Sequence, residues 1–131
     1  MTFNRRMFLG TGAAAAAALS APAVLADGHG KPRVVVIGGG VVVVNAAKMA
    51  VGLGARVTVL DRSVPRLRYL ADIFGSSIST RYSSRAILEE VCATADMVIG
   101  AVLIPGASAA KLILKSFLSQ MLPGAVIVDV A

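Results

Sequence analysis

Two glycines and an acid stand at a spacing that suits nucleotide binding: Gly38, Gly40 and Asp61. Gly38 permits a tight turn, and Gly40 lacks a Cβ atom, so the backbone there can approach a phosphate. A helix that begins at this turn directs its free N–H groups and the positive end of its dipole at the phosphates. An acid about 20 residues after the first glycine accepts hydrogen bonds from ribose hydroxyls. Asp61 lies near that spacing, so the pattern indicates a dinucleotide site.

The charge of Asp61 indicates which dinucleotide is bound. A carboxylate beside the ribose repels a 2′-phosphate, so NAD is expected rather than NADP, although the neighbouring Arg62 weakens that preference. The pattern departs from the usual one at position 43, where the third glycine is replaced by Val43. That glycine normally lets the helix and strand pack closely. The added volume of a valine is therefore expected to impair cofactor binding.

The elements around the glycines must position them. Residues 34–37 form a β-branched run that predicts a buried strand, residues 42–53 predict a helix that stops at Gly54, and residues 56–60 predict a second strand. Val41–Val44 is a run of residues that a helix tolerates less well, so a β-hairpin around a three-glycine loop is the alternative. The sequence AAKMAVGLGA that follows favours the helix.

Downstream, apolar runs alternate with segments of helical spacing. This alternation predicts an α/β fold, a Rossmann-type doubly wound parallel sheet of about five strands, which is incomplete. The remaining predicted strands are 78–82, 97–102 and 125–130, and the remaining predicted helices lie near 67–74, at 84–93 and at 109–121.

Composition excludes several classes of function. The chain is 56% hydrophobic and its formal net charge is +6, but the basic residues are mostly scattered and there is no Trp, so nucleic-acid binding is not expected. The single cysteine, Cys92, excludes an intramolecular disulfide. The single histidine, His29, lies in a predicted linker. Neither a metal site nor a Ser-His-Asp arrangement can be assembled from these residues.

The N-terminus has the layout of an export signal. Arg5 and Arg6 precede an Ala-rich apolar stretch, and small residues ending at Ala26 offer a cleavage site. Paired arginines before Phe8 and Leu9 resemble a twin-arginine signal, which predicts contact with export machinery and a periplasmic location, with the cytoplasm as the alternative. We therefore expect a signal at 1–26, a linker at 27–32 and the Rossmann domain at 33–131.

Several phrases resemble alanine dehydrogenase, of the alanine dehydrogenase and NAD(P) transhydrogenase family. They are GGGVVVVNAAKMAVGLGARVTVLDR, RYSS, ADMVIGAVLIPGA and LPGAVIVDVA. The transhydrogenase α-subunit shares the fold but matches these phrases less closely. The resemblance implies contacts with NAD at the glycine turn and ribose, around the adenosine, after the fourth strand and near the nicotinamide. The residues implied are Gly38, Gly40, Val41, Val42, Asp61, Arg66, Ser83, Val102, Leu103 and Val130.

The resemblance names no catalytic residue in this chain. In alanine dehydrogenases an arginine, a lysine and a histidine of a substrate domain act on L-alanine or pyruvate, and the catalytic aspartate follows the fifth strand. Three readings result: one half of an NAD-dependent oxidoreductase, a non-catalytic exported nucleotide-binding module, and a truncated remnant. Because some apolar sheet surface is expected to lie uncovered, self-association is a further expectation.

Overall fold

The computed structural model describes residues 30–102 and 113–130. The chain divides into two compact units, Met1–Lys31 and Pro32–Ala131, and only the second is described at length. The predicted signal, the first half of the predicted linker (27–29) and Leu103 lie outside the described residues. Among the residues that are described, no helix is long and apolar enough to span a membrane.

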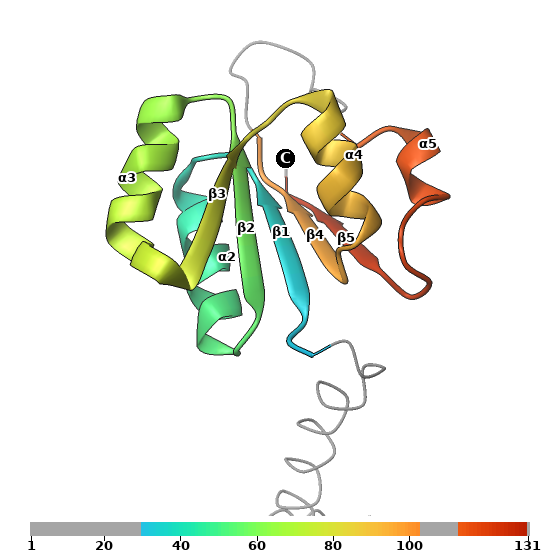
Figure 1. The fold of residues 1–131 in the computed structure, drawn as a ribbon, viewed down its shortest axis with the longest axis horizontal. Helices are drawn as coiled ribbons and strands as arrows, with labels where there is room; N and C mark the ends of the chain where they lie inside the picture. The colour runs from blue at the N-terminus through green and yellow to red at the C-terminus, as the bar shows by residue number, and fades with distance from the viewer. Residues whose placement is uncertain (1–29, 103–112, 131) are drawn as a thin grey trace, which may run out of the picture. The chain divides into compact units, whose positions relative to one another are not determined.

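Five parallel strands form one sheet in the order β3-β2-β1-β4-β5 (Figure 1). The described helices connect them, with a short 3-10 turn, η1, after α3. The prediction of a doubly wound α/β sheet is confirmed. The strands are β1 (Arg33–Ile37), β2 (Arg56–Asp61), β3 (Ile78–Tyr82), β4 (Met97–Gly100) and β5 (Val126–Asp129). The helices are α2 (Val41–Gly52), α3 (Val64–Phe74), α4 (Arg85–Ala93) and α5 (Lys115–Leu118), and η1 is Gly75–Ser77.

The alternation of side chains in β1 divides the core between the two faces of the sheet. Val34 and Val36 pack in the cluster that contains residues of α2 and α3. Val35 and Ile37 pack in the cluster that contains residues of α4 and α5. Helices therefore lie on both faces (Figure 1), which explains why the central strands β1 and β4 are almost continuously apolar.

The hairpin alternative is wrong. The segment after the glycines is helix α2, and β1 pairs in parallel with β2 and β4. Val43 is fully buried in the cluster that α2 shares with the strands. Burial of a valine side chain contributes about 1.5–3 kcal/mol, more than the few tenths by which β-branched residues disfavour a helix. Tertiary packing therefore outweighs local preference here.

The helix predicted at 109–121 is wrong over most of its described length. Only Lys115–Leu118 is helical, and Leu114 is extended, with φ −79° and ψ 149°. Ile113 and Leu114 pack against the core cluster that contains Phe117. Reaching that cluster requires an extended chain before the helix. Gly124, at φ +82°, turns the chain into β5.

Candidate functional site

A cleft of about 400 Å³ lies at the carboxyl ends of the central strands. From β1 the chain passes outward to β2 and β3, and β4 and β5 then extend the sheet on the opposite side of β1. Open α/β sheets bind ligands at this topological switch point. We call this the switch-point cleft, and its lining residues are Gly38, Gly39, Gly40, Asp61, Ser63, Arg66, Ala101 and Val102.

The glycine turn passes close to its neighbours at Gly38 and Gly39, whereas a Cβ at Gly40 would meet no atom within 4 Å. Gly38 has φ +119°, and a Cβ there would lie 2.8 Å from the carbonyl oxygen of Ala101. A Cβ at Gly39 would lie 2.5 Å from Cγ of Arg66 and 2.7 Å from Oδ2 of Asp61. Gly39 was not among the predicted site residues, and its place between two other glycines was the signal that could have identified it.

The N-terminus of α2, which follows the turn, lacks a side-chain cap. Gly40 occupies the N-cap position and supplies no side-chain hydrogen bond. By contrast, Ser63 caps α3 and Ser84 caps α4, each hydroxyl accepting a backbone N–H at 3.3 Å. The first N–H groups of a helix have no acceptor within it. Those of α2 therefore remain suited to an anion in the switch-point cleft.

Asp61 and Arg66 line the cleft beside the turn and lie close to Gly39. The Ser63 backbone N–H donates to Oδ1 of Asp61 at 2.6 Å, which holds the carboxylate at the end of β2. Arg66 donates through Nε to the carbonyl oxygen of Gly39, and its guanidinium stacks 4.7 Å from the centre of the Tyr69 ring. Ser63 was missed by sequence reasoning, although a serine just before a helix with proline in its first turn is a recognisable N-cap.

Half of the ten predicted contact residues line the switch-point cleft. They come from the turn after β1, the end of β2, the first turn of α3 and the segment after β4. They are Gly38, Gly40, Asp61, Arg66 and Val102.

The other predicted contacts lie elsewhere. Val41 and Val42 are exposed in the first turn of α2 and do not line the cleft. Ser83 is buried and its backbone N–H donates to the backbone carbonyl of Asp61 at 2.9 Å. It therefore holds the end of β2 in place but does not line the cleft. Val130 is 52% exposed just after β5. Leu103 lies outside the described residues.

These features fit a dinucleotide. The turn leaves room for a pyrophosphate at an uncapped helix N-terminus, and Asp61 offers a carboxylate oxygen at the edge of the cleft. Val43 faces the sheet and does not line the cleft. A doubly wound parallel sheet with this site at its switch point defines a dinucleotide-binding domain of the Rossmann class.

The particular family is shown by comparison with known proteins. The family model described as Alanine dehydrogenase/PNT, C-terminal domain, matches residues 9–131. The chain therefore belongs to the alanine dehydrogenase/PNT C-terminal domain family. The predictions of an alanine dehydrogenase-type domain and of a family that depends on NAD(H) are confirmed.

Individual relatives agree with this assignment. The alanine dehydrogenase of Halomonas elongata is 58% identical over 99 residues, covering 76% of this chain and 27% of that protein. The alanine dehydrogenase of Bacillus subtilis is 54% identical over 104 residues, covering 79% and 28%. The chain thus spans little more than a quarter of the length of these relatives.

Solved structures of an alanine dehydrogenase and of a transhydrogenase can both be superposed on this chain. An L-alanine dehydrogenase structure superposes with a TM-score of 0.74 at 53% identity, covering 76% of this chain and 28% of that one. A transhydrogenase from Sinorhizobium meliloti superposes with a TM-score of 0.64 at 30% identity, covering 73% and 27%. The chain is therefore more similar to the alanine dehydrogenase than to this transhydrogenase.

Proposed function

We propose that residues 33–131 bind NAD(H) and supply the cofactor half of an alanine dehydrogenase-like oxidoreductase. In that reaction L-alanine, NAD⁺ and water give pyruvate, ammonium, NADH and a proton, and NAD⁺ bound in the cleft would serve as the hydride acceptor. The observation that carries the proposal is the convergence of the glycine turn, the uncapped α2 and Asp61 on one cleft. Similarity to alanine dehydrogenases, stronger than to the transhydrogenase, supports this choice over a transhydrogenase-type domain.

Each part of the cleft has a role in this proposal. The N–H groups at the start of α2 hold the pyrophosphate, since Gly40 leaves them uncapped. Asp61 accepts from the ribose hydroxyls, and its Oδ1 is oriented by the Ser63 N–H. Arg66 lies beside the adenosine, where its hydrogen bond to Gly39 and its stacking on Tyr69 limit its movement. Val102 closes the side of the cleft after β4.

Calorimetric titration of the full chain tests the proposal. NADH is expected to bind saturably and NADPH far more weakly. Asp61→Asn removes a charge-assisted hydrogen bond worth about 1.5–3 kcal/mol, so NADH affinity falls by about 10- to 100-fold and the preference over NADPH narrows. Asp72→Asn, an exposed position of α3 outside the cleft, is the control. Absence of saturable NADH binding would support the remnant reading instead.

Catalysis is a separate question from binding. A chain that binds NADH but forms none from L-alanine and NAD⁺ supplies the cofactor half alone. If the chain forms pyruvate and NADH in equal amounts, the hypothesis of a non-catalytic nucleotide-binding module is contradicted. If it binds neither NADH nor NADPH, both the oxidoreductase and the nucleotide-binding module are contradicted. Absorbance at the NADH band and chemical detection of pyruvate together distinguish these outcomes.

We also propose that residues 1–26 direct export to the periplasm. The support is the order of Arg5 and Arg6, an apolar Ala-rich stretch and the small residues before Asp27. Cell fractionation tests this: Arg5→Lys with Arg6→Lys is expected to retain the chain in the cytoplasm. An unchanged distribution would support the cytoplasmic alternative.

We further propose self-association through the edge of the sheet at β5. Val126 and Val128 are 46% and 41% exposed on one face of that strand, and Val130 continues the row. Exposed apolar strands at a sheet edge promote pairing with another chain. Size-exclusion chromatography with light scattering is expected to show species larger than a monomer, and Val128→Lys is expected to reduce them. A monomer at all concentrations would contradict the proposal.

A further inference from the structure

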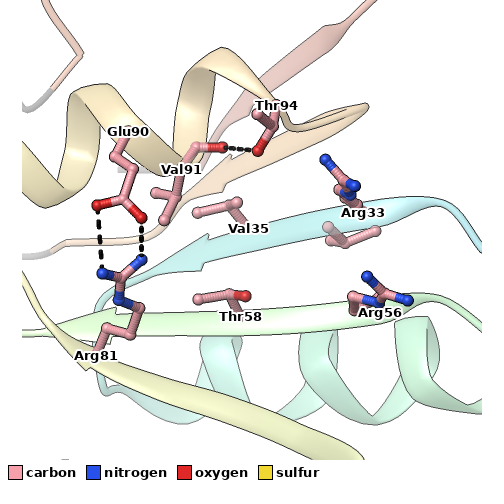
Figure 2. A pocket seen from close by; sticks show the side chains of 9 residues that line it. Arg33, Val35, Arg56, Thr58, Arg81, Glu90, Val91 and Thr94 are labelled. Carbon is pink, nitrogen blue, oxygen red and sulfur yellow. Dashed lines mark hydrogen bonds and ion pairs between the residues drawn. The ribbon is translucent and has the colours of Figure 1, made fainter. Parts of the chain in front are cut away.

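A second cleft lies on the face of the sheet that carries α4, and Arg33 and Arg56 form its end farther from the switch-point cleft. Its volume is about 240 Å³, and α4 forms one wall (Figure 2). We call it the arginine cleft. Arg33 and Arg56 are the first residues of β1 and β2, whereas the glycine turn and Asp61 lie at the ends of those strands. At about 3.3 Å per residue, the Cα atoms of Arg33 and Ile37 lie about 13 Å apart along β1, so this end of the arginine cleft is separate from the switch-point cleft.

Three arginines contribute to the arginine cleft, and one of them is neutralised. Arg81 forms a two-pronged ion pair with Glu90 of α4, with N···O distances of 2.8 and 3.3 Å. Figure 2 shows this pair at one end of the cleft, and Arg33 and Arg56 at the other. Among the described residues, the ion pairs are Arg81–Glu90 and one within α4, and neither includes Arg33 or Arg56.

The strand register places Arg33 and Arg56 side by side. They are directly paired in the parallel ladder, so their Cα atoms lie about 4.8 Å apart. Both side chains lie on the face of the sheet that carries Val35 and Thr58, because side chains two residues apart in a strand share a face. Like charges directly opposite each other on one face are destabilising. The nearby Asp96 carboxylate accepts the backbone N–H of Arg33 at 2.7 Å.

We propose that the arginine cleft binds a small dianion through Arg33 and Arg56. A guanidinium presents paired N–H donors that match phosphate and carboxylate oxygens. An anion between the two side chains would remove their mutual repulsion. Val35 and Val91 are buried and give the floor an apolar part, with the Thr58 side chain beside them. The volume is below the 300–1,000 Å³ of ordinary ligand pockets, which favours a phosphate- or dicarboxylate-sized ligand over a nucleotide.

Amide NMR titration of the full chain with inorganic phosphate tests the proposal, using sodium chloride at equal ionic strength as reference. Saturable shifts are expected at the Thr58 and Val91 amides. Phosphate also suits the N-terminus of α2, so shifts at Gly40 are followed as a separate curve. Malonate in a parallel titration shows whether the ligand chemistry extends to a dicarboxylate.

Arg33→Gln combined with Arg56→Gln is expected to weaken phosphate binding at Thr58 and Val91 by about tenfold or more and to leave the Gly40 curve unchanged. Arg68→Gln on α3, outside this cleft, is the matched control. If the double variant does not fold, Arg56→Gln alone, at an exposed position, is expected to give a smaller loss at the same amides. The proposal would be overturned by equal shifts with chloride, or by a double variant that binds phosphate as tightly as the original chain. It would also be overturned if an acidic polymer, polyglutamate, shifted the Thr58 and Val91 amides while neither phosphate nor malonate did.

Discussion

Replacing Val43 by glycine restores the third glycine of the dinucleotide-binding pattern and separates the stability of α2 from its role in cofactor binding. Val43 is 0% exposed and lies in the core cluster between α2 and the sheet. The substitution removes three buried carbons, each worth about 0.8 kcal/mol. Glycine in place of valine within a helix costs about a further 0.4 kcal/mol, because valine is itself a weaker helix former than alanine. The expected loss in the free energy of unfolding is therefore about 3 kcal/mol, with any remaining cavity adding to it.

Val42→Gly is the matched control for the helix term. Val42 is the preceding residue of the same helix and is 46% exposed, so the same change there costs the helix preference of about 0.4 kcal/mol and a smaller loss of burial. Urea unfolding of both variants at one temperature isolates the packing contribution of Val43. A Val43→Gly variant no less stable than Val42→Gly would refute the conclusion that this side chain stabilises the contact of α2 with the sheet.

Cofactor affinity should respond differently from stability. Val43 does not line the switch-point cleft, so NADH affinity measured by calorimetry should change by less than about threefold in Val43→Gly. A gain in NADH affinity of about tenfold or more would mean that the valine holds the N-terminus of α2 away from the pyrophosphate. That outcome would agree with the expectation from the sequence that Val43 impairs cofactor binding. The two measurements thus test the packing argument and the binding argument independently.

Three further predictions concern single side chains. The hydrogen bond and charge of Arg81 hold the pKa of Glu90 below its ordinary value. The pair's contribution to stability is therefore present above the unfolded-state pKa and is lost as the pH falls through the folded-state pKa. Carboxyl NMR should show a higher Glu90 pKa in Arg81→Gln, and an unchanged pKa would contradict the pairing. Burial raises the pKa of the Cys92 thiol, so its alkylation should be slow in the folded chain and fast in denaturant; equal rates would contradict its burial. Gly39→Ala should weaken NADH binding and lower Tm, because its Cβ would meet Arg66 and Asp61, and unchanged values would contradict this close approach.

The sheet was predictable because its signals are local. Strand β1 is a β-branched run that ends in glycines, and α2 and β2 follow at the spacing of a βαβ unit. The same local chemistry identified Asp61 and the turn at Gly38. Each of these features depends on a residue type whose conformational preference or charge is visible in a single stretch of sequence.

Other features depend on contacts between distant segments. The extended conformation of Leu114 follows from packing against a core cluster that local periodicity does not reveal. The exclusion of a side chain at Gly39 depends on Arg66, 27 positions away, whose Nε donates to the Gly39 carbonyl. Such contacts require the register of the elements, so residue spacing alone could not have identified them.

The arginine cleft illustrates the same dependence and adds a constraint on the sheet. Arg33 and Arg56 are unremarkable in sequence, and only the parallel register of β1 and β2 makes them neighbours. A shift of one strand by a single residue would turn its arginine to the opposite face. That shift would also move each buried side chain of the same strand from one core cluster to the other and disrupt the packing of both, so the repulsion between the arginines cannot be relieved by slippage. Relief comes from negative charge outside the two strands: the Asp96 carboxylate beside the Arg33 backbone supplies part of it, and the proposed anion would add to it.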